Sequence, residues 1–111
     1  MTVRGFVREI QVEVRETVDL LPDRAAELLN RLSALYGNIS DEIRAADAAY
    51  AVVLLQHLET SEKANRAKIR AETTPEFARA REARDTRELA IELSRALKYF
   101  LRVKSDELRA G

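Results

Sequence analysis

The chain contains no cysteine and only one histidine, and these two shortages exclude several kinds of site. Without cysteine there is neither a disulfide nor a thiolate metal ligand, which fits a reducing compartment. The single histidine, His57, has no cysteine to activate, so the usual nucleophile–base pairs and zinc ligand sets are excluded as well. Because His57 falls on an apolar helical stripe, we interpret it as a core or interface residue.

Glycine, proline and aromatic residues are also scarce. The 111 residues include three glycines, two prolines and 5% aromatics, and no glycine belongs to a phosphate-binding loop motif. Alanine, leucine and valine dominate the apolar residues, and 34% of the chain is charged, a composition typical of long helices. We therefore predict an all-α protein that is not an enzyme, with no catalytic residues, no metal and no cofactor.

Long hydrophobic runs are absent. The longest is Ala48–Leu55, far short of the roughly 18 residues that a membrane-spanning helix needs. The N-terminus lacks a basic region followed by an apolar block, so we expect no signal peptide. These two observations predict a cytoplasmic protein with no membrane partner.

Apolar residues recur at spacings of three and four along most of the chain, which indicates amphipathic helices. The predicted helices cover residues 2–21, 23–36, 41–72 and 85–109. Residues suited to helix ends mark most of the boundaries: Pro22, Gly37, Ser40, Thr74 and Pro75. Two points stay open. The alternation over 10–14 would also suit a strand, and residues 76–84 form a short helix, a connector or the beginning of the last helix.

The expected architecture is a helical hairpin of two long helices, preceded by two shorter N-terminal helices. Residues 1–40 form the N-terminal helical segment and 41–111 the long hairpin, within one domain. A helix over 41–72 would be about 48 Å long at 1.5 Å per residue, too long for a compact domain of this size to cover. Val52 and Leu55 lie behind its main apolar stripe, so we predict that they contact other protomers in an oligomeric helical bundle or coiled coil.

The zero net charge conceals an uneven distribution. Residues 1–61 hold six Arg and ten acidic residues, whereas 62–111 hold thirteen Lys and Arg and nine acidic residues. The cations that we select as a nucleic-acid-binding set are Lys63, Arg66, Lys68, Arg70, Arg95, Lys98 and Arg102. If the last two long helices pack antiparallel, these cations can form a continuous basic strip. Either they pair with nearby glutamates on solvated helix faces, or they bind phosphates with little base selectivity.

From Ala49 to Arg109 the order of segments resembles the UvsY-type recombination mediators of tailed phages. The pattern is YAVVLLQHLETSEKANRAKIRAE, a short break, and RELAIELSRALKYFLRVKSDELR. This is a resemblance of arrangement over about the last 60 residues. It implies a ring-like homo-oligomer that binds single-stranded DNA, with a recombinase or single-strand-binding protein as partner. The DNA contacts that it implies are Lys63, Arg66, Lys68 and Arg70.

Pattern and resemblance together predict a non-enzymatic accessory protein. We expect a homo-oligomer that binds single-stranded DNA in phage-type recombination or replication. The alternative is a protein–protein interaction module, such as an assembly chaperone or a small inhibitor of a host or defence protein, whose basic face meets an acidic partner. A role at a membrane surface is a weaker third interpretation, because the apolar face of the last helix is more simply used in the core.

Overall fold

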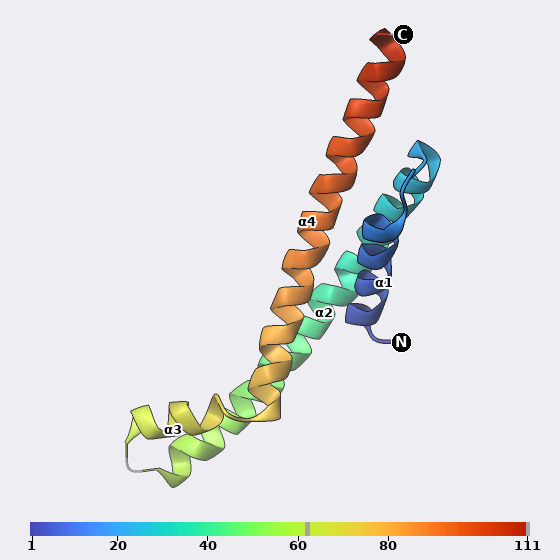
Figure 1. The fold of residues 1–111 in the computed structure, drawn as a ribbon. Helices are drawn as coiled ribbons and strands as arrows, with labels where there is room; N and C mark the ends of the chain where they lie inside the picture. Colours follow the sequence, from blue (N-terminus) through green and yellow to red (C-terminus); the bar gives the residue numbers. More distant parts are fainter. Residues whose placement is uncertain (62, 111) are drawn as a thin grey trace.

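The computed structural model is an elongated bundle of four helices (Figure 1). It describes residues 1–61 and 63–110. The helices are α1 (Val3–Glu16), α2 (Pro22–Thr60), α3 (Ala64–Ala71) and α4 (Pro75–Ala110). No strand occurs in these two ranges, so the all-α prediction is confirmed and residues 10–14 are helical. The molecule measures 70 × 24 × 21 Å, and its radius of gyration of 19.3 Å exceeds the roughly 13 Å of a compact domain of this length.

Two long helices form the predicted hairpin. α2 and α4 run antiparallel along each other, and α1 packs against both near the start of α2 (Figure 1). The main core lies among these three helices, where the buried residues are Val7, Ile10, Ala25, Leu28, Leu32, Ile39, Ala90, Leu93 and Leu97. Burial of each large apolar side chain contributes about 1.5–3 kcal/mol, so this cluster holds the hairpin together.

A second, smaller core lies nearer the turn of the hairpin. It consists of Ala46 from α2 and Ala80 and Ala83 from α4, with Ile43 and Tyr50 packed against it. Side chains this small allow the backbones of the two helices to approach closely. Residues at this crossing therefore set the spacing between α2 and α4.

The predicted helix boundary between Tyr36 and Asp41 is wrong, because α2 continues through it without interruption. The apolar stripe does not stop at Gly37: Leu32 before it and Ile39 after it belong to the same core. A glycine in a helix interior costs about 1 kcal/mol relative to alanine, and burial of the flanking side chains outweighs that cost. The two short N-terminal helices of the prediction are thus one short helix, α1, and the first part of α2.

We expect Gly37→Ala to raise the free energy of unfolding by about 0.5–1 kcal/mol. Gly37 is exposed, and no atom lies within 4 Å of a Cβ added there, so the substitution introduces no clash. Urea denaturation followed by circular dichroism measures the change. Gly5→Ala is the control, since its Cβ would lie 2.6 Å from Met1 Cγ and part of the gain should be lost. An unchanged or lower midpoint for Gly37→Ala would contradict the helical geometry at this position.

The predicted helix over 41–72 is also interrupted. α2 ends at Thr60, and the backbone of Ser61 and of Lys63 is extended. The short helix α3 then turns back along the end of α2 and buries Ala67 and Ala71. A helix continued without a break would have placed Ala64, seven residues after His57, on the inner stripe, but Ala64 is exposed. The change of direction shifts the buried face to a different set of alanines.

The predicted break at Thr73–Pro75 is confirmed. Thr74 Oγ1 accepts a hydrogen bond from Phe77 N at 3.4 Å, and Pro75 is the first residue of α4. A proline is favoured at this position because its missing N–H would have no partner inside the helix. Residues 76–84 therefore belong to the last helix, which begins at Pro75 and not at Asp85.

α1 is shorter than predicted. Thr2 Oγ1 accepts a hydrogen bond from Gly5 N at 3.0 Å and caps its start, whereas the helix ends at Glu16 and not at Leu21. An ion pair joins α1 to α2: Arg24 donates to both carboxylate oxygens of Glu13, at 2.5 and 2.6 Å. The hydrogen bonds from Arg24 hold the pKa of Glu13 below its ordinary value.

Candidate interaction surfaces

The α3 patch is the most concentrated group of cations in the molecule. It consists of Lys63, Arg66, Lys68 and Arg70, all exposed, and α3 itself contains no acidic residue. None of the four pairs with a carboxylate of the residues that the structure describes. The interpretation that these cations are neutralised by neighbouring glutamates therefore has no support among those residues.

Three of these cations surround one hollow. Lys63, Arg66 and Arg70 line a depression of about 180 Å³ together with Thr60 and Ser61. Ser61 Oγ is buried and has no hydrogen-bond partner within the described ranges. Positive charges that converge on one space, with hydroxyl groups beside them, favour an anion such as a phosphate oxygen.

The α4 patch consists of Arg95, Lys98 and Arg102, and all three side chains are exposed. They too form no ion pair with any residue placed by the structure. Tyr99, also exposed, is the aromatic residue beside them. Arg95 follows Pro75 by twenty positions, which corresponds to about 30 Å along the helix axis. The α4 patch therefore lies far from α3, which sits at the turn of the hairpin (Figure 1).

Two of the four arginines between the two patches are neutralised. Arg79 binds both oxygens of Glu42 at 2.7 and 3.1 Å, and Arg84 binds both oxygens of Asp47 at 2.7 Å each. Hydrogen bonds from the arginines lower the pKa of Glu42 and of Asp47, so both pairs stay ionised at neutral pH. These two ion pairs therefore neutralise part of the basic surface between the α3 patch and the α4 patch.

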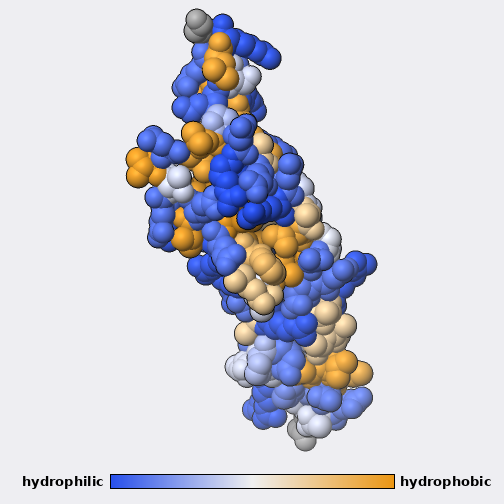
Figure 2. All heavy atoms as spheres, turned by 90° about the vertical axis from the view of Figure 1, so that its right-hand side faces the viewer, coloured by the Kyte–Doolittle hydropathy of each residue, from blue (hydrophilic) through white to orange (hydrophobic). Residues whose placement is uncertain are grey.

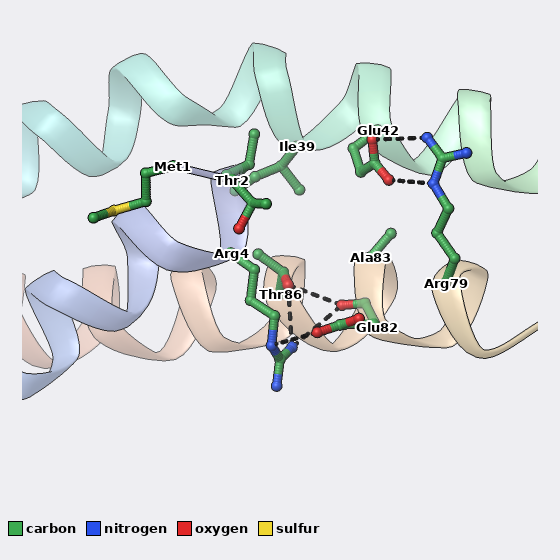
Figure 3. A pocket seen from close by; sticks show the side chains of 10 residues that line it. Met1, Thr2, Arg4, Ile39, Glu42, Arg79, Glu82, Ala83 and Thr86 are labelled. Atoms are coloured by element: carbon green, nitrogen blue, oxygen red, sulfur yellow. Dashed lines mark hydrogen bonds and ion pairs between the residues drawn. The ribbon is translucent and has the colours of Figure 1, made fainter. Parts of the chain in front are cut away.

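A hollow lies between the start of α1 and the two long helices (Figure 3). Its volume is about 490 Å³, and its charged groups are already paired. Arg4 forms an ion pair with Glu82 at 2.9 Å and donates to Thr86 Oγ1 at 3.3 Å, and the Arg79–Glu42 pair closes the far side. Because these charges satisfy one another, the hollow offers a ligand little electrostatic attraction, and its residues chiefly fasten α1 to the hairpin.

Val52 and Leu55, predicted as oligomer contacts, are each 57% exposed. Leu58 is 42% exposed, and Ala48 and Ala51 on the same side of α2 are exposed as well. Hydrophobic atoms also reach the surface near the turn of the hairpin in Figure 2. These side chains have no covering layer within a single chain. His57, by contrast, is half-buried, as expected for a residue on the inner stripe.

The described residues contain neither a membrane-spanning helix nor a metal-binding cluster. No helix there is both long and apolar enough to cross a membrane. No group of three or more His, Asp or Glu side chains in the same ranges is arranged to hold a metal ion.

Comparison with known proteins assigns no family to the chain. No protein-family model matches it, no curated protein is significantly similar in sequence, and no solved structure is significantly similar in fold.

Proposed function

We propose that the protein is a non-enzymatic accessory protein that binds single-stranded DNA, as a homo-oligomer, in recombination or replication of the phage type. The observation that carries this proposal is the α3 patch, four exposed cations that form no ion pair with a carboxylate of residues 1–61 or 63–110. Some arginines elsewhere in the hairpin do pair with carboxylates, as at Arg79 and Arg84. Because the described residues offer the α3 patch no such partner, its four charges together favour an external anion.

A phosphate backbone is the anion that suits this surface best. Lys and Arg side chains bind phosphates by displacing condensed counterions, and this contribution depends little on the base sequence. Proteins that stack bases usually present several aromatic side chains, whereas only Tyr99 lies beside a basic patch here. We therefore propose binding without base selectivity, led by the α3 patch and extended by the α4 patch.

We expect Arg66→Ala/Arg70→Ala to weaken binding to an unstructured oligonucleotide and to reduce its salt dependence. Loss of two phosphate contacts should lower the slope of log affinity against log salt by about 1.4, at about 0.7 per contact on a single strand. Fluorescence anisotropy between about 50 mM and 200 mM salt measures both quantities. The matched control is Arg8→Ala/Arg15→Ala, which removes the same charge from exposed positions of α1.

The control separates a local contact from a general effect of charge. If both double variants lose the same affinity and slope, the α3 patch has no special role. If the wild-type protein does not bind at low salt, the DNA proposal is wrong. The exposed side chains of Val52 and Leu55 would then favour the second candidate, a protein–protein interaction module whose basic patches meet an acidic partner.

A further inference from the structure

One face of α2 between Arg44 and Glu59 is apolar although it faces solvent. Its exposed residues are Ala45, Ala48, Ala51, Val52, Leu55 and Leu58. Spacings of three, four and seven residues place them along one side of the helix. A charged residue stands at each end of this apolar face, Arg44 at the start and Glu59 at the finish, and both are exposed.

The other elements of the hairpin leave this face free. Ala46 and Tyr50 point toward Ala80 and Ala83 of α4 in the smaller core. Ala46 is two residues from Ala48, which corresponds to about 200° around the helix, so the apolar face points away from α4. Its cover must therefore come from outside the described chain.

We infer that the apolar face packs antiparallel against the same face of a second copy, with Val52 close to the two-fold axis. An isologous contact of this kind uses one self-complementary surface twice and closes after two copies. The alanines permit a close approach of the two helices, while Val52, Leu55 and Leu58 supply the apolar area removed from water. The inference specifies the homo-oligomer of the proposed function but does not depend on DNA binding.

The charges at the ends of the face select the antiparallel direction. Arg44 precedes Val52 by eight residues and Glu59 follows it by seven. In an antiparallel pair centred on Val52, each Arg44 therefore lies near the Glu59 of the other copy. A parallel pair would instead set arginine against arginine and glutamate against glutamate. Opposite charges across such a seam favour association and like charges oppose it. Arg44 already contacts Asp41 at 2.6 Å and can bind both carboxylates.

Cysteine cross-linking tests the location of the contact, because the chain has no cysteine of its own. We expect Val52→Cys to form a disulfide-linked dimer under mild oxidation at micromolar concentration. Ser105→Cys, on an exposed part of α4, is the control and should form no disulfide-linked dimer. Mixing Ala45→Cys with Glu59→Cys tests direction: an antiparallel pair gives the mixed dimer, whereas a parallel pair gives only the two self-linked products.

Charge reversal gives a second measurement that needs no cross-link. Arg44→Glu and Glu59→Arg should each raise the dissociation constant of the dimer roughly tenfold, because attraction becomes repulsion at two symmetric positions. The double variant should restore the wild-type value. Sedimentation equilibrium gives the average mass of the particles at each protein concentration, and from it the dissociation constant of the dimer.

A wild-type mass of 12.6 kDa at micromolar concentration, or failure of Val52→Cys to link, would overturn the inference. A parallel cross-linking pattern would overturn it as well. Anisotropy with the oligonucleotide separates this failure from failure of the proposed function. If a monomer binds DNA, the inferred dimer is wrong but DNA binding stands. If the dimer forms but binds no DNA, the DNA proposal is wrong but the inferred dimer stands.

Discussion

Leu32→Ala should lower the free energy of unfolding by about 2–5 kcal/mol. Leu32 is 0% exposed and lies in the main core, near the middle of the stretch of α2 that α1 and α4 cover. Removing its branched end deletes contacts with the surrounding side chains and leaves a cavity that long, stiff helices fill only in part. The bundle is only 24 × 21 Å across, so its core is thin and each large buried side chain counts.

Urea denaturation followed by circular dichroism measures the effect of Leu32→Ala. Leu21→Ala is the control, because Leu21 is 67% exposed and its truncation should change stability by no more than about 0.5 kcal/mol. Both variants need the same protein concentration, since association with a second copy adds to apparent stability. Equal effects of the two substitutions would mean that the core described around Leu32 does not form.

Ala46→Leu should destabilise the fold by about 1–3 kcal/mol, although it adds apolar volume. Ala46 is 0% exposed and faces Ala80 and Ala83 across the hairpin, so a leucine fits only if the two helices separate. In the sequence Ala46 lies between Glu42 and Asp47, whose ion pairs join α2 to α4. Separation of the helices would lengthen those contacts and add to the cost.

Thermal unfolding compares Ala46→Leu with Ala96→Leu, which places the same side chain on an exposed part of α4. Alanine and leucine have similar helix propensities, so the control should keep nearly wild-type stability. A stabilised Ala46→Leu variant would show that α2 and α4 do not approach as closely as their small side chains indicate.

The pattern of apolar and helix-end residues predicted the helical class and the turn at Thr74–Pro75, because both depend on local chemistry. Two of the boundaries that it misplaced have opposite physical reasons. Gly37 suggested an end where tertiary packing of Leu32 and Ile39 keeps the helix intact. Between Thr60 and Lys63 the chain does turn, yet it contains neither glycine nor proline there. The apolar stripe continues past Gly37 at the same helical spacing, so it was the better indicator that the helix is uninterrupted.

The candidate surfaces were predictable in their residues but not in their arrangement. The seven cations selected from the sequence are all exposed, as is usual for Lys and Arg side chains. Neutralisation of Arg79 and Arg84 depends on carboxylates 37 residues earlier in the chain. Such partners become known only when the register between α2 and α4 is known. That register depends on where the chain turns, and the end of α2 at Thr60 was not predicted.

The elongated shape affects how the protein moves in solution. A body of 70 × 24 × 21 Å meets more friction than a sphere of the same mass, so it diffuses more slowly and tumbles faster about its long axis than end over end. Its elution from a sizing column would therefore suggest a heavier particle even for a single chain. An antiparallel pair in which the two chains overlap only near one end would be longer still. The difference between its rates of rotation about the long axis and end over end would therefore grow more than its mass.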